Sequence, residues 1–124
     1  MQTLCKAERL FGKRQVDFLF KKGERFNLEN FVIVWIYKNN QSAFPAKVLI
    51  SVPKKKIGKA TARNKLKRLI KEAYRKQKKL LYEPLTNQKK QIQLAIIYQN
   101  TNILTYTAIE SEINSALNRL IYKL

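Results

Sequence analysis

The amino-acid sequence predicts an α+β fold in which helices pack over a mixed β-sheet in two layers. Runs rich in β-branched and aromatic residues predict strands near residues 31–37, 46–52 and 91–98. Apolar residues at helical spacing predict helices near residues 13–22, 60–80 and 106–122. Because the helix at 60–80 connects two of the strands, it completes a βαβ unit, which favours parallel pairing and hence a mixed sheet.

The N-terminal part is predicted to contain one helix and one short strand. Val16, Leu19 and Phe20 recur at i, i+3 and i+4, which is the spacing of one helix face. Gly23 is expected to end this helix, and residues 24–28 are expected to form a short edge strand. The predicted order of elements is then α-β-β-β-α-β-α, with three to four strands in the sheet.

The run FVIVWIY at residues 31–37 is apolar on both faces, as expected for a central strand that is covered on both sides. Its faces alternate, with Phe31, Ile33, Trp35 and Tyr37 on one side and Val32, Val34 and Ile36 on the other. Residues 38–45, KNNQSAFP, contain the Asn, Ser and Pro that are typical of a loop. The strand at 46–52 is then predicted to be the antiparallel hairpin partner, and it ends at Pro53, which cannot donate to the ladder.

The C-terminal part is predicted to contain a loop, a strand and a closing helix. Glu83, Pro84 and the polar run TNQKK are expected to form the loop that precedes the strand at 91–98. A turn follows at 100–105, and the last helix carries a core stripe of Ile109, Ile113, Ala116, Leu117, Leu120 and Ile121. A chain of 124 residues with 45% hydrophobic content can bury one core, so we expect a single domain over residues 1–124.

A basic segment at residues 52–79 dominates the charge of the chain. It contains thirteen Lys and Arg residues against one acid, Glu72, and so carries +12 of the net charge of +18. Its helix is predicted to have a core stripe of Leu66, Leu69, Ile70, Ala73 and Tyr74, opposite a cationic face of Lys67, Arg68, Lys71, Arg75 and Lys79. Like charges at Arg63, Lys67, Lys71 and Arg75 repel at every i, i+4 step. A solvated helix face usually mixes both signs, so this repulsion favours a polyanionic partner.

The residues that the chain lacks argue against an active site made of protein side chains. There is no His, the commonest general base near neutral pH, and the eight acids are scattered, with only Glu110 and Glu112 close together. Those two point to different sides of a helix and cannot jointly hold a catalytic metal ion. Cys5 is the only cysteine, which excludes an internal disulfide and a multi-cysteine zinc site. We therefore expect no catalytic residue, no metal ligand and no protein-bound cofactor.

The sequence favours a cytoplasmic protein that binds RNA. The longest apolar run, at 31–37, is much shorter than the roughly 18 residues that cross a membrane, and the N-terminal residues MQTLCKAERLFGKR contain no apolar signal core. RNA is favoured over DNA because the basic helix lies between strands and offers little beyond Asn64 and Gln77 for hydrogen bonds to base edges.

The segment KKIGKATARNKLKRLIKEAYR at residues 55–75 resembles the signature of the bacterial ribonuclease P protein subunit. The resemblance extends over nearly the whole chain, through Leu10, the helix with Phe20 ahead of Lys-Lys-Gly, the FVIV strand and the SVPKK strand end. It implies a protein cofactor of a ribonucleoprotein endonuclease that removes the 5′ leader from precursor tRNA. It also implies that the catalytic Mg²⁺ ions belong to the RNA subunit. The implied fold is ribosomal protein S5 domain 2-like, with a left-handed βαβ crossover.

The resemblance assigns roles to particular residues. Ribonuclease P RNA is expected to contact a basic surface made of Arg63, Asn64, Lys65, Lys67, Arg68 and Lys71, with Lys54, Lys55 and Lys59 in the preceding loop. The leader of precursor tRNA is expected in a cleft between the first helix and the sheet, at Val16, Phe20, Val34, Ser51 and Lys56. The protein is not expected to form an oligomer by itself.

The chain departs from the family pattern in three ways. Lys65 stands where the family has Arg, which keeps the charge but loses a bidentate donor. Val16 and Val34 stand where aromatic side chains that can stack on bases are common. Three lysines rather than two follow Pro53, so either Lys55 or Lys56 is the one expected to face the leader.

Two other classes of protein share this size and charge. One is a ribosomal or ribosome-assembly protein that binds rRNA, and the other is a protein that compacts DNA. The RNA that accompanies the protein on purification distinguishes the first alternative, and tight binding of duplex DNA that precursor tRNA does not displace distinguishes the second.

Overall fold

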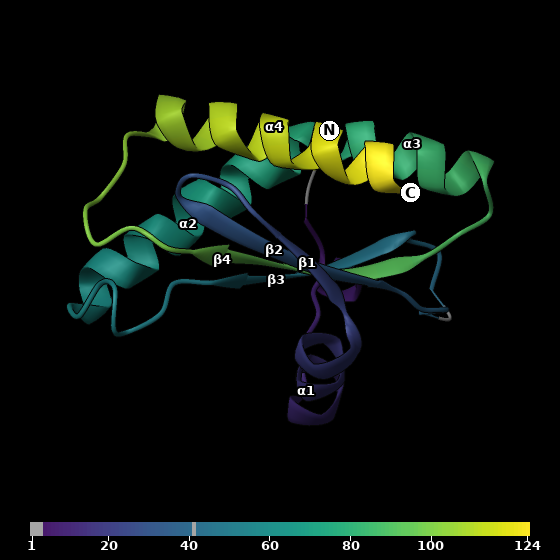
Figure 1. Ribbon diagram of the computed structural model, residues 1–124, viewed down its shortest axis with the longest axis horizontal. Coiled ribbons are helices and arrows are strands. Elements are labelled where there is room, and N and C mark those ends of the chain that lie inside the picture. Colours follow the sequence, from purple (N-terminus) through teal and green to yellow (C-terminus); the bar gives the residue numbers. More distant parts are fainter. Residues whose placement is uncertain (1–3, 41) are drawn as a thin grey trace.

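A four-stranded mixed sheet forms the centre of the structure, a computed structural model that describes residues 4–40 and 42–124 (Figure 1). The strands are β1 (Glu24–Asn27), β2 (Phe31–Tyr37), β3 (Ala46–Ser51) and β4 (Ile92–Tyr98), in the spatial order β1-β2-β4-β3. The β1–β2 and β2–β4 pairs are antiparallel, whereas β3 and β4 are parallel. The predicted α+β class, mixed sheet and parallel βαβ pair are confirmed. Residues 1–3 of the predicted N-terminal segment and Gln41 of the predicted loop lie outside the described residues.

The predicted hairpin between residues 31–37 and 46–52 is wrong, because β4 lies between these two strands. Six of the seven residues of β4 are buried. A central position in the sheet suits this strand because it removes both of its apolar faces from water. The 38–45 loop therefore crosses the end of β4. Two backbone bonds fix the crossing, from Lys38 N–H to the carbonyl of Gln91 and from Ile92 N–H to the carbonyl of Pro45.

Helices cover both faces of the sheet, but unequally. Helix α1 (Lys13–Lys22) lies alone on one face, whereas α2 (Ala60–Gln77), α3 (Lys79–Asn87) and α4 (Tyr106–Lys123) lie on the other (Figure 1). A short 3-10 turn, η1 (Lys6–Glu8), precedes α1. The prediction that the first long strand is covered on both sides is confirmed.

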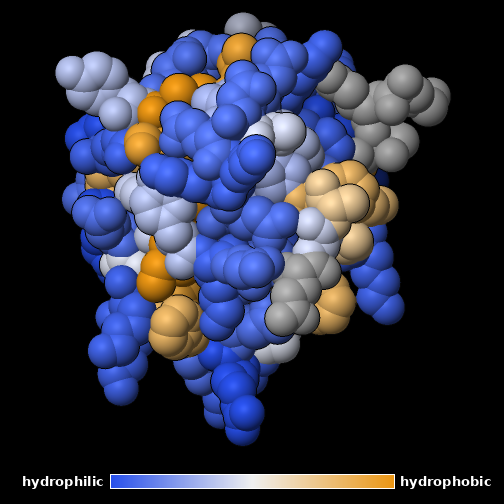
Figure 2. All heavy atoms as spheres, turned by 90° about the vertical axis from the view of Figure 1, so that its right-hand side faces the viewer, coloured by the Kyte–Doolittle hydropathy of each residue, from blue (hydrophilic) through white to orange (hydrophobic). Residues whose placement is uncertain are grey.

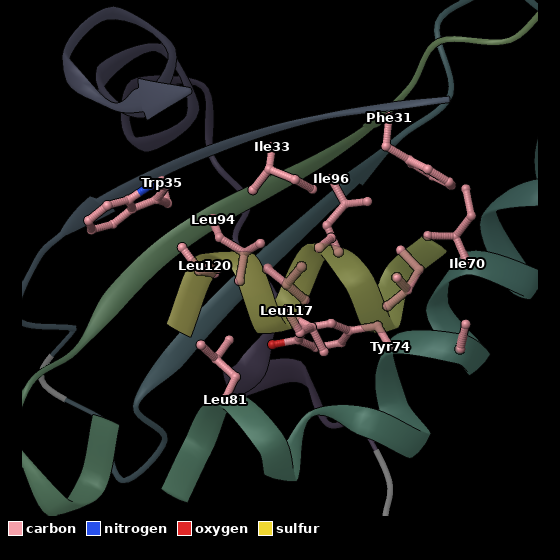
Figure 3. Packing of buried hydrophobic residues seen from close by; sticks show 14 of the residues in the cluster. Phe31, Ile33, Trp35, Ile70, Tyr74, Leu81, Leu94, Ile96, Leu117 and Leu120 are labelled. Carbon is pink, nitrogen blue, oxygen red and sulfur yellow. The ribbon is translucent and has the colours of Figure 1, made fainter. Parts of the chain in front are cut away.

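The larger core lies between the sheet and the helices α2, α3 and α4. Figure 3 shows Phe31, Ile33 and Trp35 of β2 pointing toward the same interior as Leu94 of β4 and Leu117 of α4. The alternate residues of β2 face α1 instead, where Leu10, Leu19, Val34 and Ala95 form a smaller buried cluster. This division follows the period of two along a strand, as the sequence predicts.

The predicted loop at Glu83 and Pro84 is wrong, since both residues lie within α3. Leu81 and Leu85, one helical turn apart, are fully buried and hold α3 against the core. Pro84 removes only the N–H that would bond to the carbonyl of Leu80, and Leu80 is exposed. The single predicted helix at 60–80 is consequently two helices that meet at Lys78.

Gly23 ends α1 at a place where the chain passes very close to the sheet. Its N–H bonds to the carbonyl of Leu19 at 2.8 Å. A Cβ atom here would lie 2.6 Å from that carbonyl oxygen and 3.0 Å from the carbonyl oxygen of Trp35. The predicted end of the helix at Gly23 is confirmed. Glycine is needed here because there is no room for a Cβ atom, and not because the backbone is left-handed.

Candidate nucleic-acid interface

The exposed side of α2 carries the predicted basic residues. Asn64, Lys65, Lys67 and Arg68 are exposed. The opposite side of the helix is in the core, with four residues buried: Leu66, Ile70, Ala73 and Tyr74. The predicted helix phase is therefore confirmed, except that Leu69 is only half-buried.

The loop before α2 presents three further exposed cations, Lys54, Lys55 and Lys59. It folds into a turn in which the carbonyl of Pro53 accepts bonds from the N–H groups of Lys56 and Ile57. Ile57 is buried and anchors this turn to the core. The first turn of α2 has no side-chain cap at Lys59, so its free N–H groups and the nearby lysines together favour an anion.

Arg63 has a structural contact that the sequence did not predict. Its Nη1 donates to the carbonyl oxygens of Ile57 at 3.1 Å and Gly58 at 2.7 Å. The guanidinium group therefore holds the lysine loop against the first turn of α2. Because Nη2 and Nε are left for other bonds, Arg63 can position the loop and still contact a phosphate.

The cationic face is narrower than predicted. Arg75 forms an ion pair with Glu72, the one acid of the basic segment, and the hydrogen bond from Arg75 lowers the pKa of Glu72. Lys79 belongs to α3, where its Nζ lies 3.9 Å from a carboxylate oxygen of Glu83. Of the predicted cationic face, Lys67, Arg68 and Lys71 are left for a polyanion, together with the lysines of the loop before α2.

The predicted leader-binding residues lie on the face of the sheet beside α1. Val16 and Phe20 pack on the smaller buried cluster and are partly exposed. Ser51 lies on the same face of β3 as Leu49, which packs on that cluster. Lys56 lies in the turn that follows β3 and is partly exposed. Val34 is fully buried, so it supports this surface from beneath and does not itself present atoms to a ligand.

The structure adds a pocket that the sequence did not predict. It has a volume of about 350 Å³ and lies between the N-terminal segment, the outer edge of β3 and α2. Apolar residues including Leu10, Leu49 and Phe11, which is 58% exposed, line it together with Lys67 and Lys71. The only sequence signal was the Leu-Phe pair before Gly12, which helical periodicity does not detect.

The described residues contain no group of three or more His, Cys, Asp or Glu side chains that could hold a metal ion. Cys5 is a free, exposed thiol. Within residues 4–40 and 42–124, no helix is both long and apolar enough to cross a membrane.

The fold and the basic surface define a small α+β protein with a dense group of cations on one helix and the loop before it. Comparison with known proteins identifies its family. A family model described as ribonuclease P matches residues 4–121, and the chain therefore belongs to the ribonuclease P protein family.

Individual relatives agree with this assignment. The ribonuclease P protein component of Porphyromonas gingivalis is 28% identical over 117 residues, which cover 94% of this chain and 85% of that protein. The RNase P protein from Thermotoga maritima superposes with a TM-score of 0.72 at 26% identity, covering 90% of this chain and 96% of that one. The Staphylococcus aureus RNase P protein, at 24% identity, shares the fold with a TM-score of 0.69 over 93% of this chain and 96% of its own.

Proposed function

We propose that this protein binds ribonuclease P RNA and the 5′ leader of precursor tRNA, and so promotes removal of the leader by that RNA. The observation that carries this proposal is the row of exposed cations in the first half of α2 and the loop before it, in a chain of the ribonuclease P family. The catalytic Mg²⁺ ions belong to the RNA subunit in this proposal. No protein side chain takes part in the chemical step, and the protein acts as a single RNA-binding domain in the cytoplasm, without forming an oligomer by itself.

The proposed contacts with the catalytic RNA are the exposed side chains Lys54, Lys55, Lys59, Asn64, Lys65, Lys67 and Arg68, with Arg63 and the half-buried Lys71 beside them. If about six of these cations meet phosphates, counterion release makes log affinity fall with log salt at a slope of about −4 to −5. The leader is proposed to lie along Val16, Phe20, Ser51 and Lys56, with Val34 as support. Phe20, which is partly exposed, and Phe18, which is exposed on the same helix, are aromatic side chains that could stack on a base.

The test is reconstitution with the cognate RNA subunit. The protein should increase cleavage of precursor tRNA at low Mg²⁺, where the RNA alone is slow. The double variant Lys67→Ala/Arg68→Ala should lose most of this stimulation, whereas a control that removes two exposed lysines of α1, Lys13→Ala/Lys22→Ala, should keep it. Absence of stimulation by the wild-type protein would refute the proposed function.

Sequencing of the RNA that co-purifies with the protein tests the two other classes. Enrichment of one catalytic RNA and of tRNA precursors supports the proposal. Enrichment of rRNA favours a ribosomal role instead, and tight binding of duplex DNA that precursor tRNA does not displace favours DNA compaction.

A further inference from the structure

A second group of cations lies at the opposite end of the sheet from the start of α2. There the end of β2, the 38–45 loop, the end of α3 and the start of β4 enclose a pocket of about 740 Å³. Among its described lining residues are Tyr37, Lys38, Lys89 and Lys90, and none is Asp or Glu. Figure 2 views this end of the molecule, whose visible face is largely hydrophilic.

This pocket cannot reach the same phosphates as the surface on α2. It lies at the start of β4, beside Gln91, whereas the loop that leads to α2 follows Ser51, which pairs with Ile97 near the other end of β4. Six residue steps along a strand separate the two ends of β4, which corresponds to about 20 Å. A ligand at the pocket must therefore be a different segment of a large partner, or a different partner.

The three lysines are exposed and available to an anion. None of them forms an ion pair with any acid among the described residues. The ammonium group of Lys90 lies 5.0 Å from the ring centre of Tyr37, and that of Lys38 lies 4.3 Å from the ring centre of Phe18, which belongs to α1 on the other face of the sheet. Such contacts restrain the side chains but leave N–H donors for phosphate oxygens. Tyr37 itself is 41% exposed, which presents an aromatic ring among the cations.

Lys89 occupies a backbone position that does not suit a lysine. Its φ angle is +54°, in the left-handed region, at the C-terminal end of α3. Its N–H bonds to the carbonyl of Thr86, and the N–H of Lys90 bonds to that of Leu85, which together close the end of the helix. Glycine is the usual residue at such a helix end because it adopts positive φ without strain.

The helix dipole alone does not explain Lys89. A cation near a helix C-terminus is stabilising, but a lysine at position 88, where φ is an ordinary −88°, would gain the same attraction without left-handed strain. Strain that persists at an exposed position indicates a role for the side chain. Here that side chain lines the pocket with two other lysines.

We propose that the pocket at Tyr37, Lys38, Lys89 and Lys90 is a second RNA-backbone site, which binds a segment of the RNA partner other than the one held by α2. This inference rests on the proposed function, because it takes the partner to be ribonuclease P RNA. RNA is preferred to an acidic protein because a folded polyanion can span both ends of the sheet, and because the ring of Tyr37 beside the cations suits a nucleotide.

The test measures binding to ribonuclease P RNA, without precursor tRNA, over a range of salt concentrations. The variant Lys38→Gln/Lys90→Gln should weaken binding and reduce the salt slope by about 0.7 to 0.9 for each lysine that contacts a phosphate. The control Lys13→Gln/Lys22→Gln removes the same charge from exposed positions of α1 and should change the slope by less than half as much. An unchanged slope in the pocket variant, or an equal fall in the control, would overturn the second site.

Lys89→Gly separates the role of the side chain from its effect on folding. Since glycine removes the left-handed strain, Tm should stay the same or rise, whereas affinity for the RNA should fall several-fold at moderate salt. A Tm lower by several degrees with unchanged affinity would make Lys89 a structural residue and refute the inference. If the wild-type protein does not bind this RNA at all, the proposed function fails first, whereas wild-type binding with unaffected pocket variants refutes the second site alone.

Discussion

The buried carboxylate of Glu8 should be one of the largest single contributors to the stability of this fold. Glu8 is 1% exposed, and its Oε2 accepts hydrogen bonds from the Nζ of Lys78, at 2.7 Å, and from the hydroxyl of Tyr82. Its Oε1 accepts a bond from the N–H of Cys5 at 3.1 Å. Burial raises the pKa of the Tyr82 phenol, so this hydroxyl stays protonated and continues to donate. The carboxylate thus ties the N-terminal turn to the junction of α2 and α3.

The variant Glu8→Gln keeps the shape of the side chain but removes the charge that Lys78 faces. The side chain of Lys78 is only 11% exposed, so its ammonium group cannot recover full hydration. Breaking a buried ion pair from one side costs about 3 to 5 kcal/mol in the free energy of unfolding. Urea unfolding at pH 7 measures this loss. In a double-mutant cycle with Lys78→Met, the second change should cost much less in the Glu8→Gln background than in the wild type.

The dependence on pH gives a sharper test of the same contact. Burial raises the pKa of the Glu8 carboxyl, but the hydrogen bonds from Lys78, Tyr82 and Cys5 together outweigh it and hold the pKa below the ordinary value of 4.5. Because the pKa is lower in the folded state, the stabilisation is complete above about pH 4.5 and is lost as the pH falls through the folded-state pKa.

The difference in stability between wild type and Glu8→Gln should accordingly shrink as the pH is lowered below 4.5. The other carboxyl groups titrate in both proteins and cancel from this difference. A loss below 1 kcal/mol at pH 7, or a difference that does not change with pH, would refute the argument that Glu8 is a buried, charged anchor.

Three further predictions test the helix phase, the core and the helix end. Lys67→Ala/Arg68→Ala should weaken RNA binding while leaving the urea midpoint nearly unchanged, since both side chains are exposed; a large loss of stability would contradict this placement. Ile70→Ala should cost about 2 to 5 kcal/mol because the side chain is fully buried, and Leu69→Ala should cost clearly less because it is half-buried, so equal losses in urea unfolding would contradict the assigned phase. Gly23→Ala should cost about 1 to 3 kcal/mol through the close approach of its Cβ to two backbone oxygens, and an unchanged Tm would show that the chain relaxes there freely.

Features that depend on local sequence were predicted well. The stripe through Leu66, Ile70 and Tyr74 follows from helical periodicity, and the two apolar faces of β2 follow from the period of a strand. The predicted burial of Leu69 was only partly right, because that residue lies at the edge of the buried face of α2. Periodicity gives the direction of a side chain on its own helix but not how far the neighbouring elements extend over it.

Features that depend on contacts between distant segments were not predicted. The position of β4 between β2 and β3 results from competition among strands for the centre of the sheet, and no local pattern reports the outcome. The helix at Leu81 to Leu85 was hidden by Pro84, because local propensity is overridden when two leucines gain full burial. The ion pair of Glu8 and Lys78 joins residues seventy positions apart, and neither residue is unusual in the sequence.

The contrast between local features and contacts of distant segments also explains why the sequence indicates only one of the two cationic sites. The residues of α2 are close in sequence, so their charge is visible as a run and their phase can be worked out. Lys38 and Lys90 are distant in the sequence and lie at the same end of the sheet because of its register, in which Tyr37 pairs with Ile92. A rigid sheet thus holds two groups of like charge at its opposite ends, where they repel each other weakly across solvent but can both be neutralised by one folded polyanion. The arrangement therefore favours a large, shaped partner over a short single strand, because only the former can meet both ends at once.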